Sequence, residues 1–390
     1  MTRTTEALLP AELWMEIFNK VNSFQQLIQC SMVNKRWQQL AETAIFNRDI
    51  TLVTEFDAIT FYNCLLRNGG KSKQPVKHLT MKPRDQPLGY FRDIIPFVVT
   101  HNMQTFNGSV NGALFFRVML YETFGKKGVR RFRNLKTIPS AWTYCNIYDS
   151  LLYRLRNILQ EITLNFRGIY YDPVPKWRVL SRLNKITGLQ ALNFNSYVHD
   201  VEDMETILQN CGHIKRLTIR LAVEDLFCGE TDIDQWIKIN THQCDTLGEL
   251  KIRIDKAYNP YFIDYVMYKY PNIESIIVEK IDIKEPWGSY PVDSMDISSI
   301  RSVLDKIQRV PKYTLKCNVC NSEEDDIISF LKSDGYTVYK YDQHCFTSVV
   351  TATGSNSNDS NQSSTSRSSV LPAPLRMRYP SATTDRFFEW

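Results

Sequence analysis

A short apolar pattern recurs through the middle of the chain: an apolar residue, a second one three positions later, and a third two positions after that. The last two apolar positions alternate with polar ones, which predicts a short strand with one buried face. Five segments fit closely, and their apolar residues are Leu159, Ile162 and Leu164; Leu189, Leu192 and Phe194; Ile214, Leu217 and Ile219; Leu247, Leu250 and Ile252; and Ile273, Ile276 and Val278. We therefore expect a series of similar strands.

Further segments extend this series in both directions. Upstream and downstream segments that fit in full or in part begin at Val76, Met103, Leu135, Val310 and Tyr336. Successive segments begin about 24 to 37 residues apart, and leucine-rich repeats have a period of roughly 20–29 residues. The spacing therefore predicts an internal repeat.

Amphipathic segments lie between the expected strands. Residues 200–211, 259–270 and 297–307 each place apolar residues at helical spacing, which predicts helices. A unit of one strand and one helix cannot bury its apolar side alone, so neighbouring units must stack. Residues 76–350 therefore resemble an irregular leucine-rich-repeat solenoid. An ordinary α/β domain with similarly spaced strands is the alternative.

Residues 8–48 contain several short segments that predict helices. Pro10 suits the first turn of a helix, and Ser23 followed by Gln26 forms a capping-box pattern at the start of a second. A third helix is expected to carry Val33 and Trp37. So small a bundle cannot bury all of its large apolar side chains, which predicts that some of them face another protein.

This N-terminal region resembles an F-box. The resemblance rests on the run Leu9-Pro10-Ala11-Glu12-Leu13, then Ile17-Phe18, Leu27, Cys30 and Val33-Asn34-Lys35-Arg36-Trp37. It implies binding to the Skp adaptor of a Skp–cullin–F-box ubiquitin ligase and, through the adaptor, to the cullin. The candidates for the adaptor surface or its supporting core are Leu9, Pro10, Leu13, Ile17, Phe18, Leu27, Val33 and Trp37.

An F-box followed by leucine-rich repeats resembles a class of substrate receptors. The expected fold class is α/β, with a three-helix F-box at 8–48, a connector or solenoid cap at 49–75, degenerate repeats at 76–350 and a disordered tail at 351–390. The resemblance implies that the chain recognises a target protein for ubiquitylation and does no chemistry itself. The alternative is a non-catalytic repeat scaffold that engages the adaptor without ubiquitylating a target.

The polar positions of two expected strands form a candidate substrate-binding site. Arg216 and Arg220 lie on one strand, and Lys251 and Arg253 lie on the next, with Glu249 as the opposing charge. Adjacent strands are about 4.8 Å apart, so the four cations would cluster. Because Arg matches carboxylates and phosphates, we expect an acidic or phosphorylated segment of the target there. A solvated face paired with nearby acids is the alternative.

Composition and charge limit the expected partners and the expected cellular compartment of the protein. Residues 351–370 include eight Ser, three Thr and three Asn, which predicts disorder. The net charge of +5 makes nucleic acid an unexpected partner. No apolar run approaches the ~18 residues of a membrane helix, and residues 1–9 lack an apolar signal core. Nine cysteines read as reduced thiols, so we expect an intracellular protein of the cytoplasm, the nucleus or both.

The sequence offers one weak candidate for a metal site. Cys317 and Cys320 form a CxxC pair, and His344 and Cys345 follow, so all four have side chains that bind zinc. His344 and Cys345 are adjacent, however, and Cys317 fits a strand, so no metal is expected. The sequence contains no GxxxxGK[ST], HExxH or GxSxG motif, so no catalytic residue or cofactor is expected either.

Overall fold

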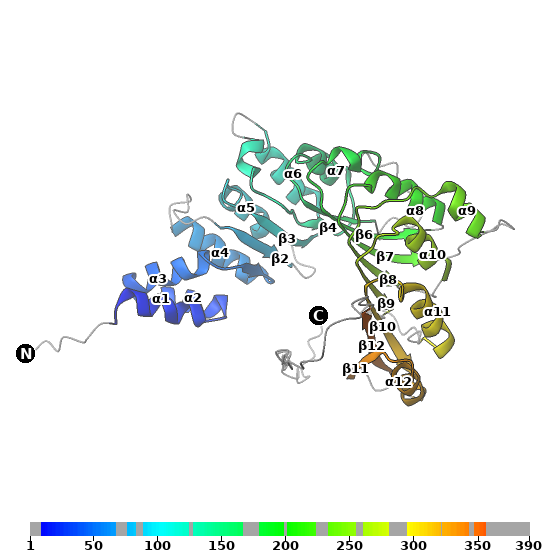
Figure 1. Ribbon diagram of the computed structural model, residues 1–390. Helices are drawn as coiled ribbons and strands as arrows, with labels where there is room; N and C mark the ends of the chain where they lie inside the picture. The colour runs from blue at the N-terminus through cyan, green and yellow to red at the C-terminus, as the bar shows by residue number, and fades with distance from the viewer. Residues whose placement is uncertain are drawn as a thin grey trace, which may run out of the picture. The chain divides into compact units, whose positions relative to one another are not determined.

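The computed structural model describes residues 9–67, 76–82, 89–124, 128–166, 179–198, 201–223, 233–254, 260–280, 295–320, 322–342 and 347–355. All of them belong to one compact unit, Met1–Asn356. Three short helices come first, and two sheets with intervening helices follow (Figure 1). This order confirms a helical N-terminal region followed by mixed α/β structure.

The N-terminal region contains α1 (Ala11–Lys20), α2 (Phe24–Ser31) and α3 (Lys35–Phe46). Two side chains cap helix starts: Ser23 Oγ accepts a hydrogen bond from the N–H of Gln26, and Asn34 Oδ1 accepts one from the N–H of Trp37. Aromatic packing joins α1 to α3, because the rings of Trp14 and Trp37 lie 4.5 Å apart between centroids. Caps and packing together fix the three helices that the sequence predicts.

The first sheet has four parallel strands in chain order. They are β1 (Ile50–Leu52), β2 (His78–Met81), β3 (Thr105–Val110) and β4 (Ser140–Ala141). The helices that accompany them are α4 (Glu55–Arg67), α5 (Gly89–Val98), α6 (Ala113–Glu122), the 3-10 helix η1 (Val129–Phe132) and α7 (Asn146–Arg154). Residues 49–75, expected to be a connector or cap, contain β1 and α4, so strand pairing begins one strand earlier than the sequence pattern indicates.

The second sheet begins with six parallel strands, again in chain order. These are β5 (Glu161–Asn165), β6 (Ala191–Val198), β7 (Arg216–Val223), β8 (Glu249–Ile254), β9 (Ser275–Lys280) and β10 (Lys312–Cys320). Between them lie η2 (Leu180–Lys185), α8 (Val201–Leu208), η3 (Gln209–Cys211), α9 (Ile233–Asn240), α10 (Pro260–Lys269) and α11 (Ile297–Ile307). In Figure 1 the helices from α5 to α11 lie on one side of the strands.

The apolar positions that define the sequence pattern face the same side of the sheet. Those of neighbouring strands pair directly, and one continuous row consists of Leu164, Phe194, Ile219, Ile252, Val278 and Leu315. Every side chain in this row is buried. The period-2 alternation thus places one face of each strand in the core beneath the helices.

One backbone position recurs through both sheets. In successive units, the residue after the first apolar position donates its N–H to the carbonyl of its counterpart in the preceding unit. The donors are Gln104, Lys136, Gln160, Gln190, Lys215, Gly248 and Glu274, and the carbonyl of Lys77 accepts the first of these bonds. The N···O distances are 2.7 to 2.9 Å, and the bond from Gln160 to Lys136 joins the two sheets. Pro311 holds the next counterpart position and cannot donate, and the N–H of Lys312 bonds the carbonyl of Glu274 at 3.1 Å.

The series of parallel strands ends differently from the expected repeat at Tyr336. β11 (Thr337–Asp342) does not pair with β10; instead β12 (Thr347–Ser355) lies between them, antiparallel to both. A parallel crossover needs a dozen or more residues, and the link from β11 to β12 is too short to supply one.

β12 also runs five residues into the predicted tail, because Val350 and Ala352 alternate with threonines and are buried. Because the serine-rich composition predicts disorder from residue 351, the sequence does not predict this part of the strand. The remainder of the tail, residues 356–390, lies outside the described residues.

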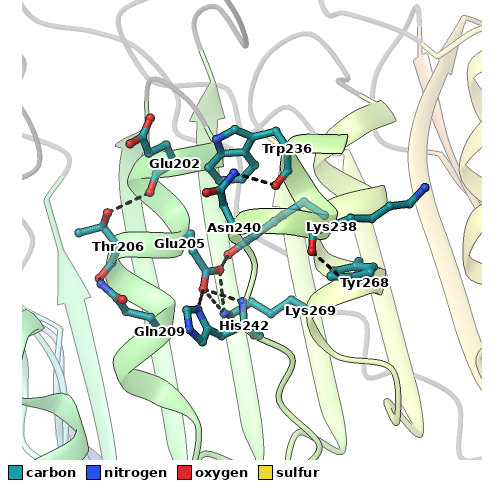
Figure 2. A network of polar contacts seen from close by, with 11 residues as sticks. Glu202, Glu205, Thr206, Gln209, Trp236, Lys238, Asn240, His242, Tyr268 and Lys269 are labelled. Atoms are coloured by element: carbon teal, nitrogen blue, oxygen red, sulfur yellow. Dashed lines mark hydrogen bonds and ion pairs between the residues drawn. The ribbon is translucent and has the colours of Figure 1, made fainter. Parts of the chain in front are cut away.

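A buried ion pair ties α8 to α10 (Figure 2). Lys269 Nζ lies 2.9 and 2.8 Å from the two carboxylate oxygens of Glu205, and the two side chains are 1% and 9% exposed. Tyr265 donates its hydroxyl to Glu205 Oε2 at 2.8 Å, and the backbone N–H of His242 donates to Oε1 at 3.2 Å. Burial first and then the charge of Glu205 raise the pKa of Tyr265, so its hydroxyl stays protonated and keeps this bond.

Candidate functional site

A stripe of exposed apolar side chains runs along α1. Leu9, Leu13 and Ile17 are spaced four residues apart, so they share one face of the helix and its entry. Their exposed fractions are 41%, 45% and 45%, and together with Glu16 and Lys20 they line a shallow groove. Three large aliphatic side chains side by side at the surface form the kind of patch that marks a protein interface.

The turn between α2 and α3 adds a second exposed apolar pair. Met32 and Val33 are 65% and 61% exposed. Val33 is among the candidate adaptor-binding residues predicted from the sequence and Met32 is not, although a large apolar residue in a turn before the helix cap Asn34 is itself a signal of surface exposure. Helix α3 begins at Lys35, so Val33 precedes it and does not lie along it as expected.

The structure divides the predicted adaptor-binding residues into two groups. Leu9, Pro10, Leu13, Ile17 and Val33 are exposed and available for contact. Phe18 and Leu27 are buried and Trp37 is half-buried, with the ring of Phe18 5.4 Å from that of Trp37 between centroids. The second group therefore supports the surface from within, and the contact role of the first group stays a prediction.

Two arginines hold this surface in place. Arg36 Nη2 donates to the carbonyl of Leu9 at 2.9 Å, which fixes the segment before α1 against α3. Arg48 donates to the carbonyls of Phe18 at 2.8 Å, Ala44 at 3.1 Å and Val21, and so binds the end of α1 to the end of α3. The sequence does not predict this role for either arginine, because the bonds from Arg36 to Leu9 and from Arg48 to Phe18 join residues 27 and 30 positions apart.

The predicted substrate site lies on adjacent strands, as expected. Strand β7 pairs with β8 so that Arg216 faces Glu249 and Arg220 faces Arg253, with Lys251 between them in register. Arg216 is exposed, and Arg220 and Lys251 are half-buried. The four predicted cations are therefore neighbours on the face opposite the helices.

A second carboxylate lies in this cluster, which corrects the expectation that Glu249 alone opposes the cations. Glu279 on β9 lies 2.7 Å from Lys251 Nζ, 2.8 Å from Arg253 Nε and 3.4 Å from Lys316 Nζ on β10. Glu279 is not predicted from the polar positions of β7 and β8, because it lies on the next strand, β9. Pairing with a nearby acid, one of the two interpretations of this face, is thus present for at least Lys251 and Arg253.

Neighbouring cations favour the ionised form of the Glu279 carboxyl. Burial raises the pKa of this carboxyl, but the hydrogen bonds and charges of Lys251 and Arg253 outweigh burial, so the pKa is lowered below its usual value. Glu279 therefore stays ionised at neutral pH and acts as an internal anion bound by three cations.

The residues considered for zinc do not assemble in the described part of the chain. Cys317 is buried within β10, and burial raises the pKa of its thiol to about 12. Cys320 lies at the end of the strand with its Sγ 3.1 Å from Ser322 Oγ, while His344 and Cys345 lie outside the described residues. Among the described residues no group of three or more His, Cys, Asp or Glu is placed to hold a metal ion.

The fold defines a small helical module, with an apolar surface, attached to an α/β region. Residues 7–52, which span α1 to β1, match the F-box-like family, so the chain carries an F-box-like domain. The comparison with curated proteins gives no match. Within the described residues no helix is both long and apolar enough to cross a membrane.

Proposed function

We propose that this chain is the substrate-recognition subunit of a Skp–cullin–F-box ubiquitin ligase. The F-box-like domain binds the Skp adaptor, and through it the cullin, while the α/β region holds a target protein for ubiquitylation. The chain binds and does not catalyse, since ubiquitin transfer belongs to other subunits of the ligase. The observation that carries this proposal is the exposed stripe of Leu9, Leu13 and Ile17 within a domain of the F-box-like family.

We infer that the α/β region is an irregular leucine-rich-repeat solenoid, and this would suit a receptor role. The strands pair in chain order, their apolar rows continue from strand to strand, and the backbone bonds from Lys77 to Glu274 recur once per unit. Stacked repeats of this kind leave one long strand face free of helices, and that face can bind an extended partner.

The adaptor interaction is tested by placing charges in the apolar stripe. We expect the Leu13→Asp/Ile17→Asp double variant to lose at least about tenfold of the adaptor that co-purifies with the wild type, because a buried unpaired carboxylate at an interface costs several kcal/mol. The matched control is Leu114→Asp/Tyr121→Asp, which charges two exposed apolar residues of α6, 57% and 67% exposed in the wild type.

Mass spectrometry of the purified complexes measures the adaptor and the cullin with each variant, and circular dichroism confirms that each variant is folded. Equal recovery of the adaptor with a folded stripe variant and with the control would contradict the proposal. Cullin-dependent ubiquitylation of a co-purifying protein distinguishes a receptor from the alternative, a scaffold that binds the adaptor without ubiquitylating a target.

A further inference from the structure

The face of β7–β10 opposite the helices carries an excess of positive charge. Alternate positions on these strands hold six cations, which are Arg216, Arg220, Lys251, Arg253, Lys312 and Lys316. Glu249 and Glu279 are the carboxylates at the corresponding positions. Among the described residues of these strands, the cations on this face therefore outnumber the carboxylates at the corresponding positions.

The surroundings of the Glu279 carboxylate indicate which kind of ligand this face can bind. Glu279 lies at its floor, with a side chain only 8% exposed, while those of Lys251, Arg253 and Lys316 are 28%, 41% and 36% exposed. The cations therefore extend outward past the carboxylate that they bind. An ammonium has three donors and a guanidinium five, so a second anion can bind above Glu279 or displace it.

The cations themselves set the spacing of a ligand. Lys251 on β8 and Lys316 on β10 are separated by β9, but their Nζ atoms lie 2.7 and 3.4 Å from the same oxygen, Glu279 Oε1, so the two ammonium groups are no more than about 6 Å apart. An extended peptide rises about 3.3 Å per residue and places alternate side chains on one face. Two residues two positions apart, about 6.6 Å along the peptide, therefore match this spacing.

We propose that this face binds an extended anionic peptide across the strands, with two acidic or phosphorylated residues two positions apart on one face of the peptide. The inference rests on the proposed function and deepens it, because the peptide is the recognised segment of the target. A peptide fits better than a nucleic acid: Glu249 and Glu279 interrupt the cations and would repel a continuous phosphate backbone, whereas separated peptide charges avoid them.

The test is fluorescence anisotropy with the purified full-length chain and a labelled nine-residue peptide that carries two aspartates two positions apart. A second peptide has phosphoserine at both positions and so distinguishes phosphate from carboxylate recognition. A third has asparagine at both positions and serves as the neutral control, and a single-stranded RNA of nine nucleotides probes the nucleic-acid reading.

Three variants are expected to change the affinity for the anionic peptides in different ways: one weakens binding, one strengthens it and one leaves it unchanged. Lys251→Ala/Arg253→Ala should weaken binding of the aspartate or phosphoserine peptide by about tenfold or more, because two charge partners are lost. Glu279→Gln should strengthen it by roughly threefold, because the internal competitor loses its charge while its shape is kept. Lys238→Ala/Lys332→Ala removes two exposed cations, one from α9 and one from α12 (Glu324–Ser333), and should leave affinity unchanged.

The proposal is overturned if neither anionic peptide binds more tightly than the asparagine peptide, or if Glu279→Gln leaves the affinity unchanged. It is also overturned if the RNA binds more tightly than both anionic peptides and loses affinity in Lys251→Ala/Arg253→Ala. Adaptor recovery is measured with the same variants. Peptide binding that fails while the adaptor is retained refutes this inference alone, whereas loss of the adaptor interaction in the wild type refutes the proposed function.

Discussion

Single residues in this protein are often positioned by partners that are remote in sequence. Lys269 is the clearest example, because it is a charged residue at the end of an amphipathic helix and yet is only 1% exposed. Its partner Glu205 lies 64 positions earlier, on α8. Helical periodicity predicts α10 correctly but cannot predict this burial, since the reason for it lies on another unit of the fold.

The buried pair predicts a strongly non-additive response to mutation. Lys269→Met leaves the Glu205 carboxylate buried with its charge unpaired, so we expect a loss of about 3–5 kcal/mol in the free energy of unfolding. The double variant Glu205→Leu/Lys269→Met removes both charges and should lose much less than the two single variants together. Urea denaturation of the four proteins measures this coupling.

Glu202→Gln is the control for that experiment, because Glu202 is exposed on the same helix α8. Its free energy of unfolding should stay within about 0.5 kcal/mol of the wild type. Additive losses from Glu205→Leu and Lys269→Met would show that the two charges do not stabilise each other.

At the scale of single elements, the sequence predicts helices and strands best where the apolar residues follow a single period. The strands from β5 to β10 follow their alternating apolar residues, and the helices α1 to α3 follow their caps and apolar stripes. The prediction fails where composition or chain length misleads: the threonines of β12 look like the start of a serine-rich tail, and the short link before it forces an antiparallel return. The candidate adaptor surface is predicted in part, because spacing selects a helix face but cannot separate exposed Leu13 from buried Phe18.

Gly108 makes an element-level prediction about the pairing of β2 with β3. Its φ is +122°, and a Cβ atom there would lie 1.7 Å from the carbonyl oxygen of Met81. Gly108→Ala should therefore lower the free energy of unfolding by more than about 2 kcal/mol, through both backbone strain and a clash with backbone. Gly212→Ala is the control, since nothing lies within 4 Å of its added Cβ. Equal thermal midpoints for the two variants would contradict the close approach of β2 and β3.

At the scale of the whole molecule, we expect that a change at the C-terminal end can lower stability without weakening adaptor binding. In the proposed solenoid each unit contacts only its neighbours, so we expect that damage at the C-terminal end is not transmitted to the other end. β12 is the element that tests this, because it pairs with both β10 and β11 and buries Val350 and Ala352. Its loss leaves β11 without its partner strand and exposes the edge of β10, which is a template for aggregation.

Two truncations isolate the contribution of β12. A chain that ends at residue 346 should unfold at a midpoint lower by roughly 5 °C than a chain that ends at residue 355, and should aggregate more readily on heating. Both chains should recover the same amount of adaptor below their midpoints, because the F-box-like domain lies at the opposite end of the strand order. Calorimetry and co-purification measure the two properties on the same preparations. Identical midpoints would show that β12 does not stabilise the sheet, whereas a parallel loss of adaptor binding would show that the units fold as one cooperative block and not as stacked neighbours.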